Sequence, residues 1–508
     1  MSANTAATDV PTRGRRLGVP AITVMIIAAS APLTVIAGGA TTAYSVTGSI
    51  AVPIGYIVLA IVLAIFAIGY AAMSRFITNA GAFYSYAARG LGRATGVGVS
   101  IVALVAYNCM QIGIYGMFGF QVSLFLGEKF GWDIPWWVPI LVCIAVIAVL
   151  GVNRIDLSAK VLGIIVLLEF AAVIIFDLFA FANPAEGFTA APISPAELFT
   201  PGIGAVLVFG IAAFMGFESA AIYGEEAKDP KRTVARATFA AVVIIGVFYA
   251  LSSWALALAI GTEKITGGGI TLDEAGPPLF FNFVAERLGV VFVDIMSLLF
   301  ITSLFAALTS FHNAVARYFF ALGREHVLPH GLSAVRPRQD APWAGSLTQT
   351  VLAVVVVIGF AIAGAGSEFG ILFPVVTLFS WLTNTGALGL VLLMAIVSLA
   401  VIGYFRRDAR DVGVGSRLVA PIIAFLALVT VLVLIIANFN VLLDQPEINA
   451  VTFVLPAIII VPGIIGVLWG LWLKARRPAI YEQIGHGADE ASQTLTELGD
   501  DQLEDAPR

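Results

Sequence analysis

Charged residues are scarce in this chain of 508 residues: Asp, Glu, Lys and Arg make up 12% of it, and hydrophobic residues 59%. A soluble domain typically has about 25% charged and about 45–50% apolar residues. A water-soluble fold of this composition would expose large apolar patches, which soluble proteins avoid. The composition therefore predicts a protein that lies in a lipid bilayer. A net charge of −5 gives no indication of a nucleic-acid partner.

Cysteine and histidine are also rare. The two cysteines, Cys109 and Cys143, lie inside apolar runs, so no disulfide framework is predicted. The sequence holds no phosphate-binding loop and no credible nucleophile–histidine pair. We therefore expect no enzyme, no cofactor and no metal site. The four histidines show no metal-ligand spacing: His312, His326, His330 and His486.

Long apolar runs dominate what is present. A membrane-spanning helix needs about 20 mostly apolar residues. The first run is too long for a signal peptide, and the segment before it is polar, so no cleavable signal is expected. Twelve spans are predicted, at residues 20–45, 48–72, 94–126, 136–152, 157–182, 200–222, 233–261, 287–322, 343–363, 370–402, 415–438 and 450–474.

The basic residues fix an orientation for these spans. With the N-terminus in the cytoplasm, 24 of the 27 Lys and Arg residues fall on the cytoplasmic side, against Lys129, Lys264 and Arg287 outside. Such an asymmetry is typical of correctly counted membrane helices. We expect a multi-pass protein of the cell (inner or plasma) membrane with both termini cytoplasmic. Residues 478–508 are acidic and are predicted to be a disordered tail, whereas the glycine-rich segment 261–286 is a connector or a lid.

The first span contains a proline in its middle. Pro32 lies between Ser30 and Thr34, and Gly38-Gly39 follows. Proline removes a backbone donor and clashes with the preceding turn. The segment is either a simple kink or a break that lines a binding site.

The middle of the sixth span contains two glycines, Gly210 and Gly216, with Glu218 just after them. These glycines either let neighbouring helices pack closely or interrupt the helix. Spans 1 and 6 each open a block of five helices. Interrupted helices at matching positions in two halves are typical of inverted-repeat transporters, whose substrate lies near the membrane midplane.

Four acidic residues lie within the predicted spans. Glu169 and Glu218 fall near the middle of their spans, and Asp177 and Asp294 fall nearer the outer ends. An unpaired charge at the bilayer centre costs about 2.5–3.5 kcal/mol on insertion scales. A functional role is favoured for Glu169 and Glu218, as groups that can exchange a proton.

Several stretches together carry a family resemblance. They are SRFITNAGAFYSY at 74–86, GVNR at 151–154 with SAKV at 158–161, AFMGFE at 213–218 followed by EE at 225–226 and DP at 229–230, and ARYFFALGREHVLP at 316–329. In this order the chain resembles the amino acid–polyamine–organocation superfamily. The resemblance implies an all-α polytopic membrane protein with the leucine-transporter fold: a five-plus-five inverted repeat and two additional helices. The implied division is 1–19, 20–182, 183–402, 403–477 and 478–508.

The resemblance also implies a substrate site. In the family, backbone amides at the break in helix 1 bind the substrate carboxylate, and helix 6 carbonyls bind its amine. By position, the carboxylate falls at Ser30, Ala31, Pro32, Leu33 and Thr34, and the amine at Phe209, Gly210 and Ala212. The family often has an aromatic gate at the position of Ala212, so its absence implies either a roomier pocket or a gate formed by Phe209 or Phe214. Weaker candidates for the side-chain pocket are Gln111, Tyr115 and Phe311.

Glu169 departs from the family pattern. It falls where many members carry a lysine whose ammonium replaces a sodium ion between helix 1 and Ser303, with Thr302 beside it. A carboxylate can instead bind a proton, a sodium ion or a substrate amine. The resulting expectation is a proton-coupled amino acid permease working by alternating access. The alternatives are a polyamine or amine carrier, an exchanger, a sodium symporter, and more remotely a channel or receptor. The oligomeric state is left open.

Overall fold

The computed structural model describes residues 17–77, 83–153, 159–218, 227–271, 273–335, 341–443, 445 and 447–485. These residues are helical, apart from loops and a single isolated bridge between Leu17 and Ala227. Ten helical segments among them are long and apolar enough to cross a membrane. Two shorter apolar helices, Trp137–Val152 and Ile203–Ala213, accompany them. The fold is therefore that of a multi-pass helical membrane protein.

The first half of the chain contains α1 (Val19–Ser30), α2 (Pro32–Thr34), the π-helical turn η1 (Val35–Ala40), α3 (Thr41–Thr47), α4 (Val52–Ser74), α5 (Phe83–Gly90), α6 (Arg93–Phe130), α7 (Trp137–Val152), α8 (Ala159–Ala182) and α9 (Ile203–Ala213). The second half contains α10 (Pro230–Ile260), α11 (Thr262–Thr266), α12 (Pro277–Leu288), α13 (Val290–Arg324), α14 (Trp343–Ala363), η8 (Pro374–Phe379), α15 (Ser380–Arg407), α16 (Ala420–Ala437), α17 (Phe439–Leu442), α18 (Ala450–Arg476) and α19 (Pro478–Gln483).

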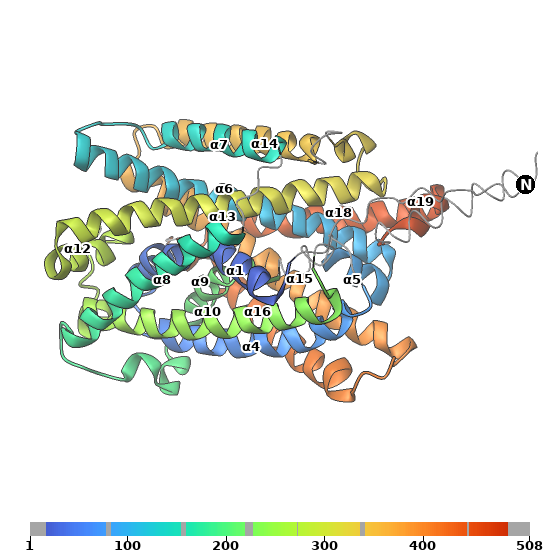
Figure 1. Ribbon diagram of the computed structural model, residues 1–508, viewed down its shortest axis with the longest axis horizontal. Coiled ribbons are helices and arrows are strands. Elements are labelled where there is room, and N and C mark those ends of the chain that lie inside the picture. Colours follow the sequence, from blue (N-terminus) through green and yellow to red (C-terminus); the bar gives the residue numbers. More distant parts are fainter. Residues whose placement is uncertain are drawn as a thin grey trace, which may run out of the picture.

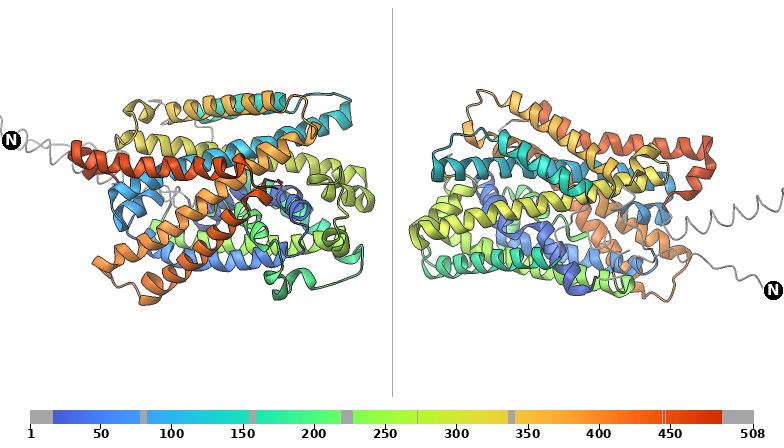
Figure 2. Two further views of the ribbon diagram at one scale, coloured as in Figure 1. Left: turned by 180° about the vertical axis from the view of Figure 1, so that it is seen from behind. Right: turned by 45° about the horizontal axis from the view of Figure 1, so that its top comes forward.

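The long helices lie side by side around a centre formed by α1 and α9 (Figure 1). Helices α7 and α14 pair as an outer layer over α6 and α13, as both views of Figure 2 show. Helices α4, α10 and α16 lie on the opposite side of α1 and α9. The α12 end and the α5 end are opposite ends of the bundle (Figure 1).

Two connecting segments are more ordered than the sequence predicted. The segment predicted as a connector or lid at 261–286 contains α11 and most of α12. The predicted disordered tail begins with a helix, α19, and the N–H of Gly485 donates to the Glu325 carboxylate at 3.0 Å. That prediction is wrong for 478–485, because a buried side chain, Ile484, and this hydrogen bond fix the segment. Residues 486–508 lie outside the described part.

Helix α6 packs closely against η8 and α15 through glycines. A Cβ added at Gly116 would lie 2.5 Å from the Pro374 carbonyl oxygen and 3.0 Å from the Phe379 nitrogen. Backbone atoms cannot yield as a flexible side chain does, so only glycine fits here. Close approach of this kind is typical of membrane helices with small residues at their contacts.

We expect Gly116→Ala to destabilise the protein by about 1–3 kcal/mol, because overpacking forces η8 away from α6. Gly359→Ala in α14 is the matched control, since nothing lies within 4 Å of its added Cβ. Thermal unfolding of detergent-solubilised protein should show a lower Tm for Gly116→Ala and no decrease for Gly359→Ala. Equal Tm values for the two variants would contradict the packing described here.

Candidate functional site

The first helix is broken at Ala31. Helix α1 ends at Ser30, Ala31 has φ 48°, and α2 begins with Pro32. A non-glycine residue in this left-handed region costs about 1–2 kcal/mol. Two side chains from other helices satisfy the backbone at the break: the Tyr249 hydroxyl donates to the Ser30 carbonyl at 3.1 Å, and the Leu33 N–H donates to a Glu169 carboxylate oxygen at 3.3 Å. An interrupted helix in a membrane needs such internal partners.

Glu169 lies behind this break and is 2% exposed. The same oxygen, Oε2, also accepts the Ser303 hydroxyl at 2.9 Å, and Thr34 donates its hydroxyl to Ser303 at 3.2 Å. One carboxylate therefore joins α8 to α2 and α13. The structure places Glu169 between the helix 1 break and Ser303, whereas the Thr302 hydroxyl donates to the Leu299 carbonyl.

The second interruption follows α9. The predicted span 200–222 is wrong in extent, because α9 ends at Ala213 and Gly216 has φ 105°. Glu218, 1% exposed, accepts the Gly216 N–H at 3.0 Å through Oε2 and the Tyr107 hydroxyl at 2.7 Å through Oε1. The carboxylate thus stabilises the turn that stops the helix. Residues 219–226, which include part of the family motif, lie outside the described residues.

Gly210 does not belong to the interruption. It lies inside α9, where an added Cβ would meet the Leu59 side chain at 2.5 Å. Close packing therefore explains this glycine, and the break predicted at 210–216 is shifted to 214–216.

A cavity of about 60 Å³ lies between the two breaks. Six residues predicted for the substrate site line it: Ser30, Ala31, Thr34, Phe209, Ala212 and Phe311. The other lining residues are Ala29, Val35, Gly39, Met110, Ile114, Ala213, Met215, Ala307, Phe379 and Thr383. None of these side chains is ionisable, and the polar ones are hydroxyls.

The remaining predicted residues lie elsewhere. Pro32, Leu33 and Gly210 are buried outside the cavity lining, and Phe214 packs edge-on against Tyr56 and Tyr249. Gln111 and Tyr115 do not line the cavity, and the Gln111 side chain contacts α13 and α14. Of the two residues predicted as an aromatic gate, Phe209 lines the cavity and Phe214 does not.

Gln111 and Tyr115 belong to a buried polar network behind the cavity wall. The Gln111 amide contacts the Tyr115 hydroxyl and His312 Nδ1, each at 3.4 Å, and hydrogen-bonds with Gln349. His312 Nε2 lies 2.7 Å from the Ser346 hydroxyl. The network ties α6 to α13 and α14 and holds Met110 and Phe311 toward the cavity.

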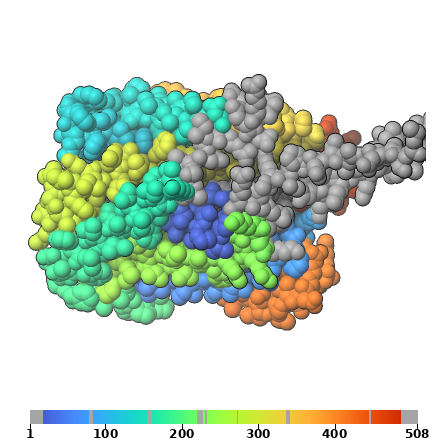
Figure 3. All heavy atoms as spheres, viewed as in Figure 1, coloured from blue at the N-terminus to red at the C-terminus, as the bar shows by residue number. Residues whose placement is uncertain are grey.

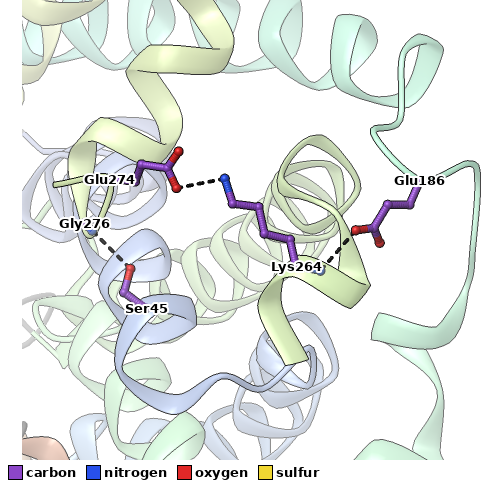
Figure 4. Close-up of polar contacts among 5 residues, drawn as sticks. All are labelled: Ser45, Glu186, Lys264, Glu274 and Gly276. Atoms are coloured by element: carbon purple, nitrogen blue, oxygen red, sulfur yellow. Dashed lines mark hydrogen bonds and ion pairs between the residues drawn. The ribbon is translucent and has the colours of Figure 1, made fainter. Parts of the chain in front are cut away.

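A second hollow lies toward the α12 end. It measures about 240 Å³, and its lining includes Thr42 and Ser45 of α3, Ile270, Thr271, Ala275 and Gly276 of the loop before α12, and Val375 and Ser380. The Gly276 N–H donates to the Ser45 hydroxyl at 3.1 Å (Figure 4). The cavity and this hollow share two wall segments. The segment α2–α3 contributes Thr34 to the cavity and Thr42 to the hollow, and the segment η8–α15 contributes Phe379 and Val375, respectively.

Lys264 fixes the loop that walls this hollow. Its ammonium lies 2.8 Å from the Glu274 carboxylate, and its backbone N–H donates to Glu186 at 3.0 Å (Figure 4). The hydrogen bond from Lys264 holds the pKa of Glu274 below its usual range.

Comparison with known proteins decides the family. A family model described as "Amino acid permease" matches residues 17–465. The chain belongs to the amino acid permease family. It is therefore a membrane transporter of the amino acid–polyamine–organocation superfamily and not an enzyme.

The curated relatives of this permease have names that refer to different substrates. It is 25% identical over 378 residues to the branched-chain amino acid permease BcaP of Lactococcus lactis, covering 70% of this chain and 75% of that protein. It is 24% identical over 292 residues to the serine/threonine exchanger SteT of Bacillus subtilis, covering 56% and 62%. It is 23% identical over 303 residues to the low-affinity putrescine importer PlaP of Escherichia coli, covering 57% and 63%.

A solved structure shares the fold of this permease. A manganese transporter of Eremococcus coleocola, with 14% identity, superposes with a TM-score of 0.57 over 94% of this chain and 100% of that one. At this identity the likeness concerns the fold alone.

Sequence reasoning missed the apolar wall of the cavity. Met110 and Ile114 line the cavity, and each precedes one of the predicted residues Gln111 and Tyr115, which do not line it, by one position. Ala307 and Phe379 carried no polar or motif signal that would have marked them, whereas Met215 lies within the AFMGFE motif and Thr383 carries a hydroxyl.

We expect Ala307→Leu to raise the KM of this permease for its substrate by about tenfold or more, because a cavity of about 60 Å³ has little spare volume. Tyr115→Phe should leave KM within about twofold, since its hydroxyl faces the network and not the cavity. Initial uptake rates in proteoliposomes measure both. A large KM change for Tyr115→Phe together with none for Ala307→Leu would mean that the substrate binds elsewhere.

Proposed function

We propose that this permease is a secondary active transporter of a small apolar amino acid, coupled to protons and working by alternating access. The observation that carries the proposal is the pairing at the helix 1 break. An apolar cavity lies on one side of it, and on the other Glu169 accepts the Leu33 N–H. The substrate site and the candidate coupling group thus meet at the same backbone segment.

The lining of the cavity supports an amino acid with an apolar side chain. Met110, Ile114 and Phe311 supply apolar surface, and no carboxylate lines the cavity. A diamine would need an acidic partner for its far ammonium group, since an unpaired charge in this environment is costly. The branched-chain relative is therefore a better guide to the substrate than the putrescine importer.

A free backbone carbonyl supports a place for the substrate amine. The Ile211 and Ala212 carbonyls accept the N–H groups of Phe214 and Met215. Among the described residues, no backbone N–H is found on the carbonyl of Ala213, the last carbonyl of α9, and Ala213 lines the cavity. This carbonyl suits an ammonium, and the substrate carboxylate then falls toward Ser30–Thr34, as the family pattern implies.

Glu169 couples the proton to this site in our proposal. As a carboxylate, it occupies the Leu33 N–H and the Ser303 hydroxyl. Once protonated, it is a weaker acceptor and becomes a donor itself, which loosens the Leu33 N–H and with it the backbone of the break that lines the cavity. Proton binding and substrate binding then favour one another. Glu218 instead stabilises the second break, where its two carboxylate oxygens accept hydrogen bonds from the Tyr107 hydroxyl and the Gly216 N–H.

The finer architecture is part of the same proposal. Counting the broken helix α1–α3 as one span and including α7 and α9 gives twelve spans, with breaks in the first and sixth. We assign an inverted repeat at 20–182 and 183–402, with both termini in the cytoplasm. The charge asymmetry of the sequence supports this orientation, which puts the α12 end outside.

Replacing the carboxyl group tests the coupling. We expect Glu169→Gln to abolish uptake driven by a pH gradient in proteoliposomes while substrate exchange continues, because the amide cannot carry a proton. Glu169→Asp, which keeps an ionisable group, should retain part of the gradient-driven uptake. Wild-type accumulation by Glu169→Gln would make Glu169 structural. Uptake that follows a sodium gradient and ignores the pH gradient would transfer the coupling to sodium, and exchange without either would make the protein an exchanger.

A matched pair of ligands tests the substrate class. Leucine and isoamylamine differ only in the α-carboxylate, and we expect leucine to bind at least about tenfold more tightly, or about 1.4 kcal/mol. Competition against radiolabelled leucine on the purified protein measures this difference, with putrescine as a second amine. Stronger competition by either amine would favour an amine carrier.

A further inference from the structure

Asp177 is a buried acid that the proposed coupling does not use. It lies in α8, on the α12 side of Glu169, and is 9% exposed. Its Oδ2 accepts the Ser252 hydroxyl of α10 at 2.7 Å. Its Oδ1 is buried without a hydrogen-bond partner. This carboxyl group therefore has one neutral donor and no cation.

Other acids toward the α12 end are neutralised or exposed. Asp294 lies 2.5 Å from the Lys129 ammonium, and Glu274 lies 2.8 Å from that of Lys264.

The groups packed around Asp177 offer no cation. Helix α10 presents hydroxyls, from Tyr249, Ser252 and Ser253. Helix α13 presents Asp294, already paired, α1 holds no ionisable side chain, and Glu286 and Arg287 of α12 are exposed. No ion pair to Asp177 is found in the described part of the chain. An unpaired charge within a membrane is costly, so a proton is the simplest means of neutralising it.

Helix α10 connects Asp177 to the helix 1 break. Ser252 and Tyr249 are three residues apart and hence neighbours on one face of α10. Tyr249 donates its hydroxyl to the Ser30 carbonyl at the break. Asp177 is also eight residues from Glu169 on α8, a rise of about 12 Å. Figure 3 shows α8 beside α1 on one face of the protein. The protonation state of Asp177 can therefore affect α10, whose Tyr249 hydrogen-bonds to the break at the end of α1.

We propose that Asp177 is a second proton-binding site, filled from the water at the α12 end. The carboxylate takes up one proton to form an O–H bond, and nothing else is transferred. The Ser252 hydroxyl, which donates to the carboxylate, can equally accept from the acid. The neutral pair keeps α10 packed on α8 and Tyr249 on the Ser30 carbonyl, and so favours the substrate-binding form. The inference rests on the proposed function, but it concerns a proton separate from that of Glu169.

The test varies the outer pH at fixed inner pH in right-side-out membrane vesicles. A proton linked to binding changes KM by about tenfold per pH unit above its titration range. In wild type, KM should rise as the outer pH rises. In Asp177→Asn, which is permanently neutral, the slope of log KM against pH should fall by about one, with KM unchanged at low pH. Asp294→Asn is the matched control and should keep the wild-type slope.

Two further variants distinguish the loss of a proton-binding group from misfolding. Asp177→Glu retains a carboxyl group and should restore most of the slope of log KM against pH. Ser252→Ala should keep a pH-dependent KM but shift the pH at which KM begins to rise. A wild-type slope in well-folded Asp177→Asn would overturn the second site while leaving the coupling at Glu169 intact. A flat profile in wild type itself would instead overturn the proposed coupling, and the second site with it.

Discussion

The hydrogen bond from the Leu33 N–H to the Glu169 carboxylate is the interaction on which the site depends. Pro32 and the left-handed Ala31 interrupt the helix and leave backbone groups without intrahelical partners. No water is available in a hydrocarbon layer to satisfy them. Because the partner is a carboxylate, the same bond that stabilises the break can be made and broken by a proton.

Similar hydrogen bonds stabilise the second break, which follows α9. Glu218 accepts the Gly216 N–H and the Tyr107 hydroxyl, while Tyr70 donates to the Glu218 carbonyl. Tyr249 does the same for Ser30. Tyrosines on neighbouring helices thus take the place of water at both interruptions. Each break is in this way tied to the helices around it, so a change at one end of such a bond is transmitted to the cavity wall.

The sequence was sufficient for the helical membrane fold and for locating an irregularity at Pro32, because long apolar runs and proline act locally, but it left a kink and a break as alternatives. Glu169 could be placed beside Ser303 only through the family pattern, since the contact spans more than 130 residues. The end of α9 at Ala213 was not predictable, because it depends on a turn closed by Glu218. The side of α6 that faces the cavity was also missed: Gln111 is satisfied by Gln349 and His312, which no local pattern brings together.

Measuring whether the Glu169 carboxyl group takes up a proton when substrate binds tests the account most directly. Infrared difference spectroscopy on the purified permease, with and without substrate, resolves the carbonyl stretch of a protonated carboxyl group. The account predicts that substrate addition near neutral pH increases this band in wild type and that the increase is absent in Glu169→Gln. A carboxylate signal that stays unchanged on substrate binding at every pH, with transport intact, would contradict it.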